Sequence, residues 1–428
     1  MRVIADLHIH SRYSRATSEK MNIDEITRFA RIKGLNLVGT GDFTHPKWLE
    51  ELKEKLVEVP DTNLYGFAKD PDSPIRYMIT TEVSTIFPFG NEVKKIHHVI
   101  LTPSLETAVQ INERLAGYGN LSADGRPTLD MDAPQLVEKV MEVSKDNVII
   151  PSHAWTPWFS IFGAFSGFNR VEDCYQDMTK HIFALETGLS SDPPMNWRLS
   201  TLDKYALVSN SDSHSCWPWR IGREANVFEL EEFTYTTVVN AIRKKDDQRF
   251  KFTIETDPAY GKYHWTGHRN CNVSLSPQEA IKFGNRCPVC RRRLTKGVEQ
   301  RVEELADRPV GFKPEGAIGY MHLLPLSEII ATVLGASYPS TTKVWDAYNG
   351  LIKKFNNEYN VLINAPKEEM TKIVDSRIAE AIVRVREGRV KVTPGYDGVY
   401  GQLVLFEETE KEESPIEKVN QRSIVDFM

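Results

Sequence analysis

The chain has 428 residues, of which 41% are hydrophobic and 26% charged, a composition typical of globular proteins and too apolar for a disordered one. Its net charge of −6 excludes a generally basic nucleic-acid-binding chain, so any such surface must be local. No run approaches the roughly 20 apolar residues of a membrane span, and the N-terminus lacks a signal-peptide pattern. The five cysteines favour bound metal over disulfides and predict a cytoplasmic protein.

The first predicted strand carries three polar residues at alternating positions. Val3 and Ile4 open an apolar run, and Asp6, His8 and His10 then alternate with apolar residues. Because side chains of an extended segment alternate between two faces, the three polar groups share one face. Two imidazoles and a carboxylate on one face predict the nucleus of a metal site.

Predicted strands and helices alternate up to about residue 250. Helices are predicted over 22–33, 48–57 and 133–144, and strands over 35–39, 77–81, 96–101, 148–150, 183–186 and 206–208. Potential metal ligands end or follow these strands, namely Asp42, Glu82, His98, His153, Asp212 and His214. The pattern predicts a parallel β/α architecture with its chemistry at the carboxyl ends of the strands.

These motifs, from Asp6-Leu-His8-Ile-His10 to Ser211-Asp212-Ser-His214, resemble those of the PHP (polymerase and histidinol phosphatase) family over about residues 1–225. The resemblance implies an irregular seven-stranded β/α barrel with two or three divalent metals. It implies one metal bound by His8, His10, Glu82 and Asp212, a second bridged by Glu82 and held by His98 and His153, and a third served by His214. His97 is the alternative to His98; we prefer His98 because the apolar run that follows it matches the family.

The second motif departs from the family pattern. Gly41-Asp42-Phe43 replaces the usual Thr-Asp-His, so a third site must use Asp42 or His45 or remain empty. Imidazole and carboxylate ligands suit Zn, Mn or Fe and do not exclude Mg. Two such ions about 3.5–4 Å apart activate water and stabilise the attacking and leaving oxygens in phosphoester hydrolysis. His8, His10, Glu82 and Asp212 are therefore the candidate catalytic residues.

An aromatic segment follows His153. Residues 155–168 include six aromatics among Gly, Ser and Pro without helical or strand periodicity. They predict either a lid over the site or a stacking surface for an unpaired base, with Trp155, Trp158 and Phe159 as the candidate pocket. Asp192 precedes two prolines and either orients water or substrate as a catalytic residue or caps a turn.

Two ligand pairs with a two-residue gap, His268/Cys271 and Cys287/Cys290, are separated by 15 residues. This spacing predicts a closed structural zinc site, with His264 as the less favoured alternative to His268. The stretch 261–301 also has nine Lys and Arg against two acids. Clustered arginines beside such a module predict phosphate contacts, and the candidates are Arg286, Arg291, Arg292, Arg293 and Lys296.

The remaining chain is predicted to be mainly helical, with helices over 326–334, 341–355 and 367–387 and a hairpin over 390–406. Residues 407–418 contain six acids and two lysines and predict a solvated linker. Gln421, Ile424 and Phe427 then resemble the peptide that binds the sliding clamp PCNA, with Met428 in place of a second aromatic.

The combination of these parts resembles the endonuclease Q family over nearly the whole chain. The resemblance implies domains over 1–255 (PHP barrel), 256–301 (zinc-binding module), 302–406 (mainly helical) and 407–428 (linker and clamp peptide), in a protein associated with the nucleoid. It implies a DNA repair endonuclease that cuts 5′ to deaminated bases (uracil, hypoxanthine, xanthine) and abasic sites, leaving 3′-hydroxyl and 5′-phosphate ends. The alternatives are a small-molecule phosphatase of the histidinol-phosphate type and a non-catalytic DNA-binding clamp adaptor.

Overall fold

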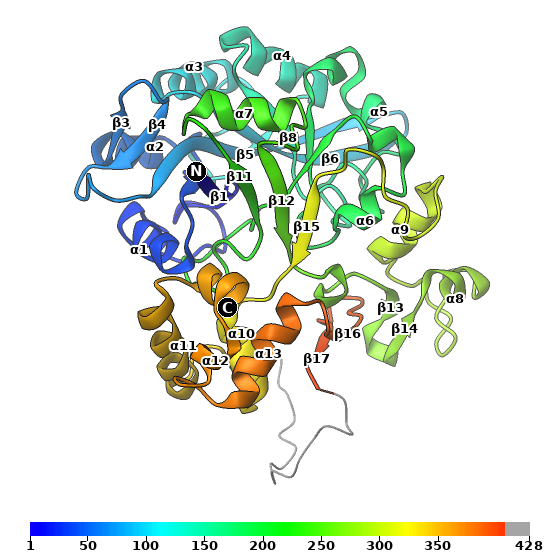
Figure 1. Ribbon diagram of the computed structural model, residues 1–428. Coiled ribbons are helices and arrows are strands. Elements are labelled where there is room, and N and C mark those ends of the chain that lie inside the picture. Colours follow the sequence, from blue (N-terminus) through cyan, green and yellow to red (C-terminus); the bar gives the residue numbers. More distant parts are fainter. Residues whose placement is uncertain (407–428) are drawn as a thin grey trace.

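The computed structural model describes residues 1–406, and its centre is a large mixed sheet covered by helices (Figure 1). One path through the sheet joins eight strands side by side, in the order β15 (Gly319–His322), β12 (Phe250–Glu255), β11 (Ala225–Glu229), β1 (Arg2–Asp6), β2 (Leu37–Gly39), β5 (Arg76–Phe89), β4 (Leu64–Phe67) and β3 (Leu56–Val59). β6 (Glu92–Thr102) and β7 (Thr128–Leu129) also pair with β5, and β8 (Val148–Pro151) pairs with β6.

Ten strands contribute residues to one buried apolar cluster. They are β1, β2, β4, β5, β6, β8, β11, β12 and the separate parallel pair β9 (Ala184–Glu186) and β10 (Ala206–Val208). The cluster includes Val3, Ala5, Leu7, Leu37, Met78, Val99, Leu101, Val148, Ile150, Ala184, Ala206 and Val208. Short bridges join Ile149 to Ile182 and Ile9 to Ser213, so the segment leaving β1 lies against the segment leaving β10. The predicted ligands after these two strands are therefore neighbours.

The expectation of a parallel arrangement is wrong for part of the sheet. β6 runs antiparallel to both β5 and β8, and β11 runs antiparallel to β1. β5 and β6 are joined by Gly90 and Asn91 alone, and Gly90 has φ +59°. Because a two-residue turn of this kind returns the chain directly beside itself, it produces an antiparallel pair. The long β5–β6 hairpin places Glu82 and the two adjacent histidines on neighbouring strands.

The helices of the first half follow the predicted periodicity closely. In α1 (Ile23–Lys33) the Asn22 side chain accepts a hydrogen bond from the backbone N–H of Glu25, and Gly34 ends the helix with φ +97°. The helix predicted over 48–57 spans Pro46–Lys55 (α2), and the one predicted over 133–144 spans Ala133–Val143 (α4). The other helices up to residue 305 are α3 (Leu105–Leu115), α5 (Val171–Tyr175), α6 (Pro193–Asn196), α7 (Tyr235–Arg243), α8 (Pro277–Lys282) and α9 (Val298–Leu305).

A small module lies apart from the large sheet. It contains the antiparallel hairpin β13 (Thr266–His268) and β14 (Val273–Leu275) and the short helix α8, which Figure 1 shows at one corner of the molecule. Its own apolar core has only four buried residues, Val273, Ala280, Cys287 and Leu294. A core of this size cannot stabilise a module by burial alone, so another source of stability is expected.

The C-terminal helices gather below the sheet in Figure 1. The predictions for α10 (Leu326–Leu334) and α11 (Thr342–Phe355) are confirmed to within a residue, and the hairpin of β16 (Lys391–Thr393) and β17 (Gln402–Val404) is present. The single helix predicted over 367–387 is wrong: α12 (Lys367–Met370) and α13 (Ser376–Arg386) are separate, because the Asp375 side chain caps a new helix. β15, from the range predicted to be helical, pairs with β12 of the large sheet.

In the part of the chain that the structure describes, no helix is both long and apolar enough to cross a membrane. The predicted clamp-binding residues and the acidic linker before them lie outside the described residues.

Candidate metal centre

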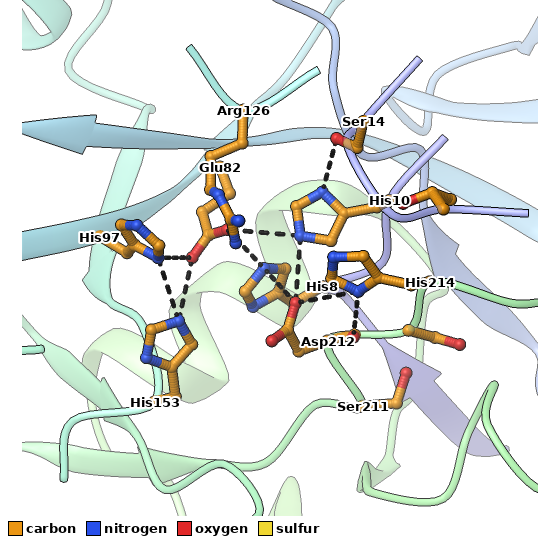
Figure 2. Close-up of polar contacts among 12 residues, drawn as sticks. His8, His10, Ser14, Glu82, His97, Arg126, His153, Ser211, Asp212 and His214 are labelled. Carbon is orange, nitrogen blue, oxygen red and sulfur yellow. Dashed lines mark hydrogen bonds and ion pairs between the residues drawn. The ribbon is translucent and has the colours of Figure 1, made fainter. Parts of the chain in front are cut away.

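Four side chains from distant parts of the sequence meet beside the ends of β1 and β10 (Figure 2). They are His8 and His10 after β1, Glu82 within β5, and Asp212 after β10. Glu82 Oε2 lies 3.5 Å from His8 Nε2 and 3.3 Å from His10 Nε2, and Asp212 Oδ1 lies 3.0 Å from His10 Nε2. His8, His10 and Glu82 are all buried. The four predicted ligands of the first metal are therefore brought together.

A second group shares Glu82. Its other oxygen, Oε1, lies 3.1 Å from His97 Nδ1 and 3.2 Å from His153 Nε2, and these two nitrogens are 3.3 Å apart. Thus Oε2 of the Glu82 carboxylate faces the first group of ligands and Oε1 faces the second, as Figure 2 shows. This is the arrangement of a carboxylate that bridges two metal ions.

The donors of both groups fit divalent metals. Ligands around a tetrahedral ion with bonds of about 2.0–2.1 Å lie about 3.3–3.4 Å from one another, and the donor atoms here are separated by 3.0–3.5 Å. In addition, His8 Nε2 is buried without a hydrogen-bond partner. A buried polar atom without a partner is costly, and a metal ion would satisfy it.

The charges of the first group are strongly coupled. Burial alone lowers the pKa of His8, but the carboxylates of Glu186 and Glu82 outweigh this effect and raise the pKa well above its usual value. Burial alone raises the pKa of Asp212, but the neighbouring His8 and His10 hold that pKa well below its usual range. The Asp212 carboxylate is therefore ionised at neutral pH, as a metal ligand must be.

Two carboxylates stand behind the ligating histidines. Glu186, at the end of β9, lies 3.1 Å from His8 Nδ1 through both of its oxygens. Asp42 Oδ1 lies 2.9 Å from His10 Nδ1, while its other oxygen accepts hydrogen bonds from Ser11 and Ser14. Such carboxylates fix the tautomer and orientation of a metal-binding histidine. Asp42 is therefore a supporting residue and not the direct ligand that we predicted.

Asp6 also differs from the expectation of a shared metal-binding face. Its carboxylate accepts hydrogen bonds from the backbone and hydroxyl of Ser211 and from the backbone of Gly222. It is fully buried and absent from both ligand groups. Asp6 thus holds the segment before Asp212 in place, and the metal-facing pair of this strand is His8 and His10 alone.

The preference for His98 over His97 is wrong. His98 lies opposite Val83 in the β5–β6 ladder, whereas His97 lies opposite Ser84 and so on the face where Glu82 lies. His98 turns away from the site, where its Nδ1 is 2.8 Å from the Tyr175 hydroxyl. His97 takes the place predicted for His98 beside Glu82 and His153.

The predicted third site has no counterpart among residues 1–406, where the only candidate groups are the two described above and a cysteine-containing set. Phe43 is fully buried in the apolar core, and His45 stacks on Tyr13 with ring centroids 4.5 Å apart. His214 lies beside the centre, with its ring 4.4 Å from that of His10, but its Nδ1 contacts the backbone oxygen of Asp212.

Arg126 is a site residue that the sequence did not reveal. It comes from the irregular segment between α3 and β7, and its guanidinium donates to Glu82 Oε2 over 2.9 Å. Burial alone would lower the pKa of Arg126, but the Glu82 carboxylate raises it, so the group stays cationic. With 26% of its side chain exposed, this cation is open to an anionic substrate at the centre.

Asp192 lies outside both ligand groups. One of its oxygens accepts a hydrogen bond from the backbone of Met195 and caps α6, and the other lies 3.1 Å from His322 Nε2. The capping alternative is therefore present in the structure. The loop that leads to Asp192 passes His153, because a Cβ on Gly188 would lie 2.7 Å from the His153 Cβ.

The aromatic segment divides into a buried and an exposed part. Trp155 is buried, packs on Phe162 and donates its indole N–H to Asn196, so its assignment to a base pocket is wrong. Phe159 is half-buried with its ring centroid 4.8 Å from that of His97, and Trp158 is exposed. Phe159 is thus the aromatic face next to the second ligand group.

The third candidate group is the predicted zinc site. His268 on β13, Cys271, Cys287 and Cys290 place their donor atoms within 4.8 Å of one another, and His268 Nδ1 lies 3.4 Å from Cys290 Sγ. His264 instead lies near Glu299, with 3.5 Å between Nε2 and Oε2. A zinc ion bound by these four donors would stabilise the small module, whose apolar core is too small to do so alone.

The basic residues of the module are not equivalent. Of the five predicted phosphate contacts, four are exposed, namely Arg286, Arg291, Arg292 and Arg293. Lys296 is half-buried and forms an ion pair with Glu304, with 2.6 Å between Nζ and Oε1. Lys296 is therefore already paired with a carboxylate, which argues against the phosphate contact that we predicted for it.

Comparisons with known proteins identify a matching domain and similar folds. Residues 325–389 match the family model of the MJ0043 C-terminal domain. The fold is similar to the crystal structure of the lesion-specific endonuclease PfuEndoQ from Pyrococcus furiosus, at 33% identity and a TM-score of 0.85, covering 96% of this chain and 98% of that one. It is equally similar to an Endonuclease Q in complex with a 27-mer duplex carrying an abasic lesion at the active site, at 33% identity and a TM-score of 0.84, covering 96% and 99%.

A sequence relative extends beyond this chain. The uncharacterized protein MJ0043 of Methanocaldococcus jannaschii is 34% identical over 256 residues, which is 59% of this chain. The matched region spans 31% of the length of that relative.

Proposed function

The chain belongs to the endonuclease Q family, and from this premise we propose that it is a DNA repair endonuclease that hydrolyses a phosphodiester with metal-activated water. The observation that carries the proposal is the bridging position of Glu82 between two sets of donors. Paired divalent sites of this kind are typical of phosphoester hydrolysis.

Each residue of the centre has a distinct task in this proposal. His8, His10 and Asp212 hold the first ion, and His97 and His153 hold the second, with Glu82 between them. Two divalent ions there, such as Zn, Mn, Mg or Fe, would activate water and stabilise charge on the phosphate. Arg126, cationic and partly exposed, binds a phosphate oxygen beside Glu82. Asp192, after the loop that passes His153, orients water or the sugar-phosphate.

The substrate is DNA with a deaminated base or an abasic site, cut on its 5′ side to leave 3′-hydroxyl and 5′-phosphate ends. A mispaired or missing base costs little to unstack, so its nucleotide can leave the helix and reach the centre. Phe159, beside His97, supplies a face on which an extruded base stacks. Trp158, stacked on Phe165 with ring centroids 5.0 Å apart, extends this face toward solvent.

The zinc module would hold the duplex outside the centre. One zinc ion bound by His268, Cys271, Cys287 and Cys290 would keep the module folded. The exposed Arg286, Arg291, Arg292 and Arg293 contact phosphates. We further propose a barrel domain over 1–255, a helical domain over 302–406 and an intracellular, nucleoid-associated location. We also propose that the C-terminal peptide binds the sliding clamp, and a pull-down of the clamp with this peptide tests it.

The direct test is a nicking assay. Duplexes with a single uracil, hypoxanthine, xanthine or abasic site, and an undamaged control, are incubated with the protein and Mn²⁺, and the product ends are mapped. We expect a nick 5′ to each lesion and none in the control. If the protein cleaves histidinol phosphate and leaves every duplex intact, it is a small-molecule phosphatase. If it binds the duplexes but cleaves neither substrate, it is an adaptor.

A further inference from the structure

The segment that carries Asp212 is held in a strained conformation. Asp212 itself has φ +47°, a left-handed backbone that non-glycine residues seldom adopt. Such strain persists only where the surrounding structure fixes the backbone on several sides. The residue before it is fixed by two side chains: buried Asp6 accepts from the Ser211 N–H at 3.0 Å, and half-buried Arg223 donates to the Ser211 carbonyl at 3.1 Å.

Arg223 belongs to the loop that follows Asp212, and Asp6 contacts the same loop. Gly222, next to Arg223, donates its N–H to Asp6 Oδ2 over 2.8 Å. Gly222 has φ +61°, and a Cβ there would lie 3.0 Å from the Lys33 side chain and 3.1 Å from the Tyr359 hydroxyl. The position of Gly222 therefore determines where Asp6 sits, and Asp6 determines where Ser211 and Asp212 sit.

The C-terminal helices hold this loop from the other side. The Tyr359 hydroxyl donates to the carbonyl of Gly222. Glu358 pairs with Lys33 at 2.7 Å, and Lys33 donates to the carbonyl of Pro218 over 2.8 Å. Tyr359, Glu358 and Lys33 are all buried, so these bonds are shielded from water. Both contacts end on backbone carbonyls of the loop between Asp212 and β11.

Aromatic packing completes the contact. Trp217 and Trp219 of the loop are stacked, with ring centroids 5.2 Å apart and an interplanar angle of 5°. Trp345 of α11 lies 5.9 Å from each of them. The loop after Asp212 thus packs its tryptophans against α11, while its backbone contacts Lys33 and Asp6 on the side of the large sheet.

From this continuous chain of buried contacts we propose that Tyr359 is a positioning residue for the metal centre, acting through Gly222, Asp6 and Ser211 on the ligand Asp212. The proposal rests on the metal centre of the proposed function. The helical region that matches the MJ0043 C-terminal domain would thus help to position a ligand of the first group. None of the described residues of this region is itself a ligand.

Two tyrosines of the same region provide a matched test. Tyr359→Phe removes the bond to Gly222, whereas Tyr348→Phe removes a 2.8 Å bond to Glu358 Oε2 and leaves the loop carbonyls untouched. Mn²⁺ affinity of the full chain, with its structural zinc retained, is measured by electron paramagnetic resonance, and thermal unfolding of each variant is recorded. Supporting residues of this kind change metal affinity by about 10–100-fold.

We expect Tyr359→Phe to weaken the tighter Mn²⁺ site about 10-fold and to broaden its spectrum, and Tyr348→Phe to change the affinity less than about 3-fold at a similar loss of Tm. Equal effects of the two variants, or an unchanged affinity in folded Tyr359→Phe, would overturn the inference. Absence of Mn²⁺ binding by the unmodified protein would instead overturn the proposed metal centre, so the two failures are distinguishable.

Discussion

His8 and Glu186 contact each other behind the metal centre, with the Nδ1 atom of His8 3.1 Å from both oxygens of the Glu186 carboxylate. The opposite nitrogen of His8 faces Glu82. Glu186 also accepts hydrogen bonds from the His153 backbone and the Asn210 side chain, so one carboxylate supports both ligand groups. Because a carboxylate beside a metal-binding histidine makes the histidine a more basic ligand, the charge of Glu186 would contribute to metal affinity at the proposed centre.

Glu186→Gln should therefore weaken Mn²⁺ binding about 10-fold or more, because it removes the charge while keeping the shape of the side chain. Titration of Mn²⁺ at pH 7 measures the effect. The matched control is Glu172→Gln, which removes a carboxylate paired with Lys204 at the surface. Unchanged affinity in Glu186→Gln would show that the contact with His8 has no part in metal binding.

The adjacent histidines of β6 give a second prediction. His97→Ala should remove one of two bound Mn²⁺ ions, because its imidazole faces Glu82 and His153. His98→Ala should keep both ions and lose about 1–3 kcal/mol of stability, since it leaves the Tyr175 hydroxyl without its partner. Metal counting and chemical denaturation of both variants check this, and the reverse pattern would contradict the assignment.

This pair of histidines also shows what the sequence could and could not provide. Alternation in the segment that leaves β1 was enough to place His8 and His10 together. Predicted strand ends pointed to Glu82, His153 and Asp212, although Glu82 lies within the longer β5 of the structure. The choice between adjacent histidines depends on the register of two strands, which is set by the turn at Gly90 and Asn91. That register is a property of the folded hairpin, and a local apolar run does not determine it.

Other residues were missed for similar reasons. Arg126 comes from an irregular segment with no periodic pattern, and it meets Glu82 only in the folded chain. Glu186 could have been found, because it ends the strand Ala184–Glu186 in the same manner in which other ligand-type residues end theirs. Trp155 was misassigned because aromatic content alone does not distinguish a buried ring from an exposed one.

A buried carboxyl away from the ligand groups predicts a pH dependence. Glu255, at the end of β12, is fully buried, and burial raises its pKa to about 8. Below pH 4.5, the ordinary value, the group is protonated whether the chain is folded or not. Between pH 4.5 and about 8 the unfolded chain loses the proton and the folded chain keeps it, so folding becomes less favourable as pH rises.

Glu255→Gln should abolish this dependence. As pH rises, the free energy of unfolding of Glu255→Gln should increase relative to that of the unmodified protein by at most about 1.4 kcal/mol per pH unit. The difference should level off above about pH 8. Urea denaturation at pH 5, 6, 7 and 8 measures it, with the exposed Glu58→Gln as control. An advantage that does not grow with pH would mean that Glu255 is ionised in the folded protein.

Removal of the structural metal should affect one part of the chain. The module core of Val273, Ala280, Cys287 and Leu294 is too small to hold without zinc. Cys290→Ser should therefore expose the region around Arg291 to trypsin and weaken binding of duplex DNA, while the Mn²⁺ affinity of the candidate metal centre is kept. Resistance to trypsin equal to that of the unmodified protein would argue against a structural zinc.

The central claim is that Glu82 joins two metal ions which together act on DNA. Single-turnover nicking of a uracil-containing duplex, measured beside the Kd for the same duplex in the unmodified protein and in Glu82→Gln, tests it most directly. We expect the variant to cleave at least about 10³-fold more slowly while its Kd changes less than about 3-fold. Cleavage by Glu82→Gln at the rate of the unmodified protein would contradict the account.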